Sequence, residues 1–257
     1  MSLLEIRGLC VRFGGLTAVS RVDLDVEEGA LVALIGPNGA GKTTAFNVIT
    51  GVYAPSEGSV RFAGREIGGV APHTICSLGV ARTFQNIRLF RSLSALENVR
   101  AALQGAKRSG TGDMLRLAGW RRREAAAETE ARALLDELAL GSFASARADS
   151  LPYGEQRRLE IARALATRPK LLLLDEPAAG MNPAEKQALR ELVRRLRADR
   201  GLTIVLIDHD VSFVMNLSDR VAVLDHGEKI ADGAPEVVRR DPHVIEAYLG
   251  SDGEAPA

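Results

Sequence analysis

The sequence predicts an α/β fold built on a parallel β-sheet. Two segments, LLLL at 171–174 and LTIVLI at 202–207, have the pattern of buried strands; they are bounded by turn residues and separated by a helical pattern from about 183 to 199. A third apolar run, Leu31 to Ile35, precedes a helix that Gly51 is expected to end. Continuous apolar strands are typical of a sheet covered on both faces, and alternation of strands with helices favours parallel pairing.

Other segments predict additions to this sheet. Before residue 31 the chain alternates apolar and polar residues between glycines, which indicates short antiparallel strands, and 56–67 has the pattern of strand, turn and strand. From about Leu93 to Leu165 the sequence is helical and rich in Ala, Leu, Arg and Glu, with a Gly/Ser/Thr loop at 105–113. The last seven residues, SDGEAPA, are expected to form a frayed tail.

Composition limits the classes of partner. The 257 residues include 33 Lys and Arg against 33 Asp and Glu, so no overall field attracts nucleic acid or anionic lipid. The start of the chain lacks a signal-peptide pattern, and its apolar runs are too short to span a bilayer. We therefore expect a cytoplasmic protein that binds no nucleic acid and meets a membrane only through a partner. Cys10 and Cys76 are interpreted as buried thiols of a reducing compartment.

The strongest motif is a glycine-rich loop between the first buried strand and the helix after it. Such glycines let backbone N–H groups converge on phosphate oxygens, and the helix start adds its dipole. In this pattern the lysine places a charge at the β- and γ-phosphates and the next hydroxyl serves Mg²⁺. A plain glycine turn is the alternative, and the spacing disfavours it. The predicted phosphate-binding residues are Gly36, Pro37, Asn38, Gly39, Ala40, Gly41, Lys42, Thr43 and Thr44, with Thr43 also a metal ligand.

A pair of acidic residues follows the apolar run LLLL. Asp175 and Glu176 lie at the carboxyl end of a buried strand, where ligands gather on such sheets. Asp175 would help to hold Mg²⁺, commonly through water, and Glu176 would polarise an attacking water as a general base. The alternative is that the two acids only end the strand before Pro177, and the phosphate-binding loop upstream makes that alternative weaker.

With both motifs in place, the chain resembles the nucleotide-binding subunits of ABC transporters over nearly its whole length. Gln85 in ARTFQNIRLF is similar to the family's Q-loop glutamine, and LPYGEQ at 151–156 is similar to the signature motif. AGMN at 179–182 resembles the D-loop, His209 the switch histidine, and Phe13 the aromatic that stacks on adenine. Taken singly, each is as readily a surface, structural or core residue, but their shared order favours the family.

The resemblance implies a P-loop NTPase (RecA-like) core with an antiparallel β subdomain, a helical signature subdomain and a short C-terminal extension. The implied boundaries within a single domain are 1–85 and 166–227 for the nucleotide-binding core, 86–165 for the helical subdomain, and 228–257 for the extension and tail. The implied cofactors are ATP and Mg²⁺. The resemblance assigns catalysis to Glu176, His209, Gln85 and Lys42, and the metal to Thr43, Gln85 and Asp175.

In the family, the signature contacts the γ-phosphate of ATP held by a second subunit, so two subunits pair about a two-fold axis. The resemblance assigns this contact to Tyr153, Gly154 and Glu155, in a homodimer or a heterodimer with a related ATPase. The match is imperfect, because Pro152 stands where serine is usual, Tyr153 replaces the first glycine, Glu155 stands where glutamine is common and Asn182 replaces the D-loop aspartate. We expect a weakened γ-phosphate contact.

The helix after the signature has an apolar stripe that we expect to be buried. The stripe consists of Leu159, Ala162 and Leu165, and periodicity places Arg157, Arg158 and Arg163 off it.

Within the family, LPYGEQRRLEIARAL, DEPAAGMNP and the ending DGAPEVVRRDPHVIEAYLG look most like the ATPases of branched-chain amino-acid importers. Such subunits serve transmembrane permeases and, indirectly, a periplasmic solute-binding protein, and lie on the cytoplasmic face of the inner membrane. Two alternatives stay open: an ATPase of lipopolysaccharide export, and a soluble ATP-switched binding module. Leu89 and Phe90 would line the permease groove or pack in the core. The basic run at 119–124 would touch lipid head groups or be a solvated helix face.

Overall fold

A computed structural model of the chain describes residues 2–106 and 117–250. The chain divides into two compact units, one made of residues up to Arg82 together with those from Lys170 on, and the other spanning Thr83–Pro169. The tail at 251–257 and most of the loop expected at 105–113 lie outside the described residues. Gln85 and the signature residues belong to the second unit, and the other predicted site residues belong to the first.

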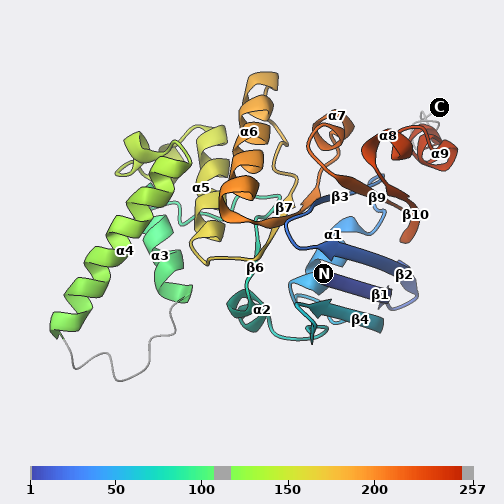
Figure 1. Ribbon diagram of the computed structural model, residues 1–257, viewed down its shortest axis with the longest axis horizontal. Helices are drawn as coiled ribbons and strands as arrows, with labels where there is room; N and C mark the ends of the chain where they lie inside the picture. The colour runs from blue at the N-terminus through green and yellow to red at the C-terminus, as the bar shows by residue number, and fades with distance from the viewer. Residues whose placement is uncertain (1, 107–116, 251–257) are drawn as a thin grey trace. The chain divides into compact units, whose positions relative to one another are not determined.

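A six-stranded sheet forms the centre of the first unit (Figure 1). Its order is β10-β9-β3-β8-β7-β6, and β10 pairs antiparallel to β9 while the other pairings are parallel. Every residue of β3, β7 and β8 is buried, which confirms the three apolar strands predicted. The strands are β3 (Leu31–Ile35), β6 (Val80–Arg82), β7 (Leu171–Asp175), β8 (Thr203–Ile207), β9 (Arg220–Asp225) and β10 (Glu228–Gly233).

The second sheet is antiparallel, with the order β2-β1-β4-β5. The prediction of short strands was wrong in length, because β1 and β2 have 12 residues each. Gly8, whose φ is 56°, lies where the pairing register shifts between Ile6 and Leu9, so this glycine is absorbed in the strand instead of ending it. The strands are β1 (Ser2–Phe13), β2 (Leu16–Glu27), β4 (Glu57–Phe62) and β5 (Arg65–Glu66).

In the first unit, α1, α6 and α7 directly follow the parallel strands β3, β7 and β8. α6 matches the helix predicted from residue 183, and Asn182 caps it, accepting from the backbone of Glu185 while the Glu185 carboxylate accepts from the backbone of Asn182. Asn182 thus has a structural role beside the D-loop role predicted for it. The helices are α1 (Lys42–Ile49), α2 (Pro72–Leu78), α6 (Pro183–Arg200), α7 (Val211–Met215), α8 (Pro235–Val238) and α9 (Pro242–Gly250).

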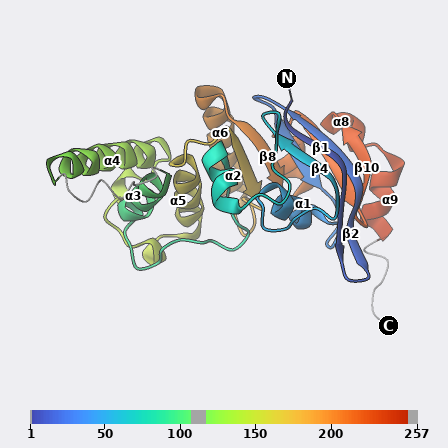
Figure 2. The same cartoon turned by 90° about the horizontal axis from the view of Figure 1, so that it is seen from below.

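The ends of the first unit's helices bear on three predictions. Gly51 follows the C-cap of α1 with a φ of 73°, as expected of a helix-ending glycine. Cys10 is buried as predicted, but Cys76 is only half-buried, because α2 is a short helix that buries one residue, Ile75. The extension packs back on the sheet, since α8 and α9 contact β10 (Figure 2).

The second unit consists of three mutually contacting helices, α3 (Ala95–Ala106), α4 (Leu117–Glu137) and α5 (Tyr153–Leu165) (Figure 2). Two short 3₁₀ turns, Gly141–Phe143 and Ala148–Ser150, precede α5. The apolar stripe predicted on α5 is buried. The basic run at 119–124 lies on α4, but the side chains of 119–121 lie outside the described residues.

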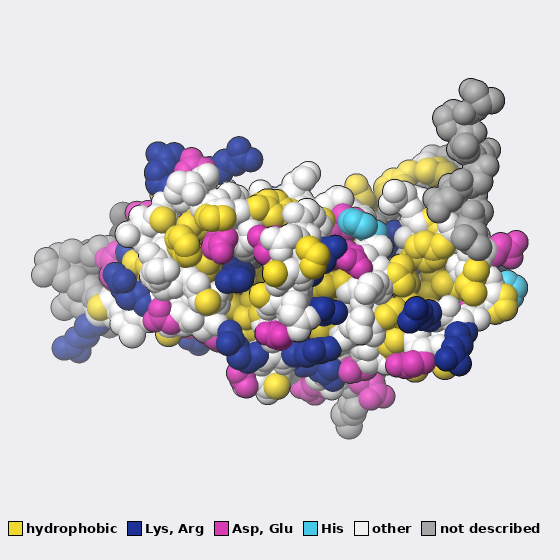
Figure 3. All heavy atoms as spheres, turned by 90° about the horizontal axis from the view of Figure 1, so that it is seen from above, with side chains coloured by type: hydrophobic (Ala, Val, Ile, Leu, Met, Phe, Trp, Pro, Cys, Tyr) yellow, Lys and Arg dark blue, Asp and Glu magenta, His cyan; other side chains and the backbone are white. Residues whose placement is uncertain are grey.

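The described surface mixes charges of both signs. On the face drawn in Figure 3, Lys and Arg side chains alternate with Asp and Glu, as the balanced composition leads one to expect. Within 2–106 and 117–250, no helix has the length and apolar character that a membrane span requires.

Candidate functional site

The loop predicted to bind phosphate connects β3 to α1 and lies against neighbouring backbone. Gly36 has a φ of 146°, and a Cβ atom there would lie 1.9 Å from the Leu224 carbonyl oxygen. Gly41 has a φ of 98°, and its Cβ would lie 2.4 Å from the Ala18 carbonyl oxygen. Both positions therefore require glycine, because any side chain would displace the backbone of β9 or β2.

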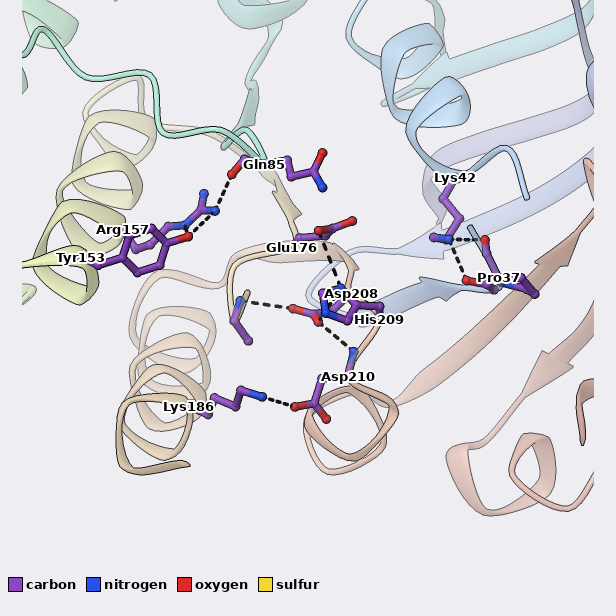
Figure 4. Close-up of polar contacts among 12 residues, drawn as sticks. Pro37, Lys42, Gln85, Tyr153, Arg157, Glu176, Lys186, Asp208, His209 and Asp210 are labelled. Atoms are coloured by element: carbon purple, nitrogen blue, oxygen red, sulfur yellow. Dashed lines mark hydrogen bonds and ion pairs between the residues drawn. The ribbon is translucent and has the colours of Figure 1, made fainter. Parts of the chain in front are cut away.

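Lys42 holds the loop together from inside. Its buried ammonium donates to the carbonyl oxygens of Gly36 at 2.7 Å and Pro37 at 2.8 Å (Figure 4). Burial lowers the pKa of Lys42, and the charges of Glu176 and Asp175 oppose that effect by raising it. The lysine thus brings a positive charge to a loop whose helix start already favours anions.

Asp175 ends β7 and forms a buried ion pair with Arg82, the last residue of the neighbouring strand β6. The Arg82 guanidinium lies 2.6 Å from the Asp175 carboxylate and 2.7 Å from the side-chain oxygen of Asn47 on α1. Sequence reasoning missed Arg82, although its place three residues before Gln85, directly after two apolar strand residues, was a signal. The arginine fixes Asp175 at the edge of the sheet and ties it to the helix of the phosphate loop.

Glu176 adopts an unusual backbone conformation with a φ of 46°. Its N–H donates to the Ile207 carbonyl at the end of β8 at 2.7 Å. Its carboxylate lies 3.7 Å from Nδ1 of His209, so two of the four residues predicted for catalysis are neighbours. Left-handed backbone in a non-glycine residue costs energy and clusters at functional sites. The side chain of His209 is 61% exposed and that of Glu176 only 19%, so His209 faces solvent and Glu176 is largely buried.

Asp208 connects the loop after Glu176 to the loop that contains His209 through hydrogen bonds to backbone N–H groups. The buried carboxylate accepts from the backbone N–H of Ala178 at 3.2 Å and of Asp210 at 2.9 Å (Figure 4). Burial raises the pKa of Asp208, and these two N–H groups oppose the rise. Asp210 in turn pairs with Lys186 of α6 at 2.5 Å. Sequence reasoning missed Asp208, whose position beside His209 at a strand end was the available signal.

Phe13 lies at the end of β1 and packs edge-to-face on Tyr53, with ring centroids 5.1 Å apart. Both rings keep exposed area, 44% for Phe13 and 39% for Tyr53. Phe13 is paired with Leu16 across the hairpin, two residues before the Ala18 carbonyl that faces Gly41. An exposed aromatic face close to the phosphate loop is suited to stacking on a base. Tyr53 was not predicted.

The second unit contains Gln85 and the signature residues. α5 begins at Tyr153, with Gly154 buried and Glu155 in the first turn. Its N-cap, Pro152, has no side-chain hydrogen bond to the helix. Arg157 was predicted only to lie off the apolar stripe of α5, yet its side chain is 3% exposed. It is buried because it donates to the backbone of the Gln85 segment, a contact that helical periodicity does not report.

Comparison with known proteins adds to this geometry. Residues 19–179, more than half of the 257, match the family model described as ABC transporter. The chain belongs to the ABC transporter family. A second model, described as Branched-chain amino acid ATP-binding cassette transporter, matches residues 228–254 of this ABC subunit. Members of the family bind ATP and hydrolyse it in step with transport, and the chain is an ATPase of this kind.

Among curated relatives, the ABC subunit is 48% identical to the high-affinity branched-chain amino acid transport ATP-binding protein BraF of Pseudomonas aeruginosa. The match covers 96% of this chain and 98% of the relative. It is 45% identical to LivG of Escherichia coli, also a high-affinity branched-chain amino acid transport ATP-binding protein, with the same coverage.

Solved structures agree on the fold. A crystal structure of an ABC transporter's ATP-binding cassette in its ADP conformation matches with a TM-score of 0.86 and 32% identity, covering 97% of this chain and 99% of the other. A dimeric cassette in a post-hydrolysis state with ADP and phosphate matches with a TM-score of 0.76 and 25% identity, covering 90% of this chain and 98% of the other. The predicted fold class, a P-loop NTPase core with added antiparallel sheet and helices, is confirmed.

Replacing Pro152 with serine is expected to raise the ATPase rate of the ABC subunit. A serine at this N-cap would accept from a backbone N–H in the first turn of α5 and would supply the hydroxyl that the family signature usually has. The cap alone is worth about 0.5–2 kcal/mol of helix stability. Steady-state ATPase and the melting temperature of both chains measure the change. An unchanged rate with a raised melting temperature would show that the hydroxyl only caps the helix.

Proposed function

We propose that this ABC subunit hydrolyses MgATP to drive import of branched-chain amino acids through a membrane permease. The observation that carries the hydrolytic part is the pairing of Glu176 with His209 at 3.7 Å, on strand ends of the same sheet that positions the Lys42 loop. Support for the solute comes from BraF and LivG, which are named for branched-chain amino acid transport, and from the match of residues 228–254 to a model of that transporter class.

The nucleotide would be held from both ends. Backbone N–H groups of 38–43 and the Lys42 ammonium would bind the phosphates, and Phe13 would stack on the adenine. Stacking gives affinity for the base with little selectivity, so we expect modest discrimination between ATP and GTP.

The donor set also fits Mg²⁺. A magnesium ion bound with a nucleotide takes one or two carboxylates beside phosphate oxygens and water. In the first unit, the Thr43 hydroxyl and the Asp175 carboxylate are donors of this type, and we assign them to the ion. We assign the Gln85 side-chain oxygen to it from the family resemblance alone. When bound, Mg²⁺ neutralises charge on the β- and γ-phosphate oxygens.

The hydrolytic roles follow from the chemistry of the residues. The Glu176 carboxylate is largely buried, with 19% of the side chain exposed. It would accept a hydrogen bond from the attacking water, orient that water and take its proton. His209 would donate to a γ-phosphate oxygen, and Lys42 would offset the charge that develops there. Asp208 would hold the two loops in register without touching the nucleotide.

We further propose that the working unit is a dimer on the cytoplasmic face of the inner membrane. The buried Gly154 and the start of α5 would meet the γ-phosphate held by a second ATPase, identical or related. One of the solved relatives is dimeric. The permease would contact the half-buried Leu89 and the Phe90 ring, 50% of which is exposed. A periplasmic solute-binding protein would act through the permease alone.

Reconstitution tests this function. The chain, co-expressed with a branched-chain amino acid permease of the same organism and purified as a complex, is placed in liposomes that contain ATP. We expect uptake of labelled leucine, isoleucine and valine when the matching solute-binding protein is present, and no uptake when the chain carries Glu176→Gln. Uptake of none of these amino acids, together with uptake of another solute class from the same panel, would overturn the assignment.

A further inference from the structure

A single buried arginine links the signature helix to the segment that contains Gln85. The Arg157 guanidinium donates to the Phe84 carbonyl at 2.6 Å and to the Gln85 carbonyl (Figure 4). It also donates to the Tyr153 hydroxyl, from Nε at 3.2 Å and from Nη2 at 3.0 Å. A guanidinium has five donors in a rigid plane, so it can hold several acceptors at fixed angles where a lysine cannot.

The same face of α5 binds the rest of this segment. Glu160 pairs with Arg157 at 3.2 Å and accepts from the backbone N–H groups of Phe84 at 3.2 Å and Arg88 at 3.3 Å. One turn further on, Arg163 donates to the Arg88 carbonyl. Residues 157, 160 and 163 are spaced by three and share one side of the helix. The backbone of residues 84–88 is therefore tied to α5 by charged side chains.

The side chain of Tyr153 gives Arg157 a further hydrogen-bond partner. It stands where the family signature has a glycine, which carries no side chain for Arg157 to hold. Here the phenol ring lies 5.4 Å from the guanidinium carbon, and the hydroxyl accepts two of its hydrogen bonds. The tyrosine is 43% exposed at the first residue of α5, so its hydroxyl is bound while much of its ring faces outward.

Burial of such charges is costly. Arg157 and Glu160 are 3% and 6% exposed, and a buried ion pair is often no more stabilising than apolar residues of the same volume. Burial raises the pKa of Glu160, against the hydrogen bonds from Phe84, Arg157 and Arg88 that lower it. Stability alone thus gives little reason for the pair, whereas fixing two segments at one geometry does.

We infer that Tyr153 and Arg157 are positioning residues that couple the signature to Gln85. A ligand that orders Tyr153 at the start of α5 orders the backbone of Gln85 through the shared guanidinium. In the dimer that ligand is the γ-phosphate held by the second subunit, so each subunit would set its own Gln85 by sensing its partner's nucleotide. The inference rests on the proposed function for the roles of the signature and of Gln85. The hydrogen bonds from Arg157 to Tyr153 and Gln85 are independent of that function.

Two conservative variants of the full chain test the link. Tyr153→Phe keeps the ring and removes the hydroxyl, and Arg157→Lys keeps the charge and removes the planar fork. In hydrogen–deuterium exchange, both are expected to speed exchange of the amides of residues 84–88 several-fold, with the phosphate loop unchanged. Arg168→Lys is the matched control, because this arginine of the same unit is 68% exposed and pairs with Glu130 on the surface. Unchanged exchange in Tyr153→Phe would overturn the link.

A double-mutant cycle tests the coupling. Tyr153→Phe removes hydrogen bonds donated by the charged Arg157 guanidinium, so it should lower kcat about tenfold or more. It should leave unchanged the Kd for a fluorescent ATP analogue bound at the chain's own phosphate loop. In a Gln85→Ala background, Tyr153→Phe should have no further effect on kcat, because the pair acts through Gln85. Additive losses would overturn the coupling. If the wild-type chain hydrolyses no ATP, the proposed function fails, while the exchange experiment still decides whether the link exists.

Discussion

Replacing Glu176 with glutamine is expected to lower ATP turnover by about 10²- to 10⁴-fold, the usual contribution of a general base. The amide cannot take a proton from water, yet it has nearly the size and shape of the carboxylate. The backbone of Glu176, held by the Ile207 carbonyl at 2.7 Å, should stay in place. ATP binding should therefore persist, and the dimer that forms on ATP should accumulate because hydrolysis no longer separates it.

Phosphate release and gel filtration with ATP measure the two effects in one preparation. Glu191→Gln is a matched control, since this residue is an exposed carboxylate on α6 of the same unit. The control should turn over ATP at the wild-type rate. Rapid turnover by Glu176→Gln would remove Glu176 from catalysis and would point to another base near the end of β7.

Local patterns predicted the part of the fold that buries apolar residues in regular spacing. The strands β3, β7 and β8 each contain four or five consecutive apolar residues, and such runs are typical of strands in a sheet covered on both faces. The phosphate loop was predictable for a similar reason. A Cβ atom at Gly36 or Gly41 would lie 1.9 Å or 2.4 Å from a backbone carbonyl oxygen, so only glycine fits at these positions. The sequence itself therefore reveals the constraint.

Interactions set by tertiary contact were not predictable in this way. Arg157 lies two positions before Leu159, on the other side of the helix from the apolar stripe, and periodicity does not indicate what that side contacts. It is buried because a segment about 70 residues earlier presents the carbonyls of Phe84 and Gln85 to it. Arg82 and Asp175, 93 residues apart, are a second case. The place of Arg82 after two apolar strand residues was a signal that it matters, but the neighbouring residues of neither arginine indicate its partner.

The candidate site was predicted as a set of residues, and the structure adds what holds them. Asp175 and Glu176 are adjacent in sequence but differ in environment, since Asp175 is buried beside Arg82 and Glu176 lies beside His209. This difference suits Asp175 to a fixed role at a cation and Glu176 to proton transfer.

Replacing Lys42 with alanine is expected to weaken ATP binding before it changes any other property. Its ammonium is the positive side chain of the phosphate loop and lies near two carboxylates, Asp175 and Glu176, whose charges oppose the lowering of its pKa by burial. Without it, a polyphosphate would approach those carboxylates with only backbone N–H groups to attract it. Loss of one or two charge-assisted hydrogen bonds, worth about 1.5–3 kcal/mol each, predicts a Kd for ATP raised at least tenfold.

Loss of the hydrogen bonds that Lys42 makes within the loop should also raise the Kd for ATP. Lys42 donates to the carbonyls of Gly36 and Pro37, so its removal also loosens the loop whose N–H groups would bind phosphate. Lys42→Met separates the two causes in part, because it keeps the buried stem and removes the charge. Titration with a fluorescent ATP analogue gives Kd for each variant, and Lys170→Ala, an exposed lysine of the same unit, is the control. If Kd stays at the wild-type value while kcat falls, Lys42 would act in the transition state alone, and the binding energy of the loop would reside in its backbone.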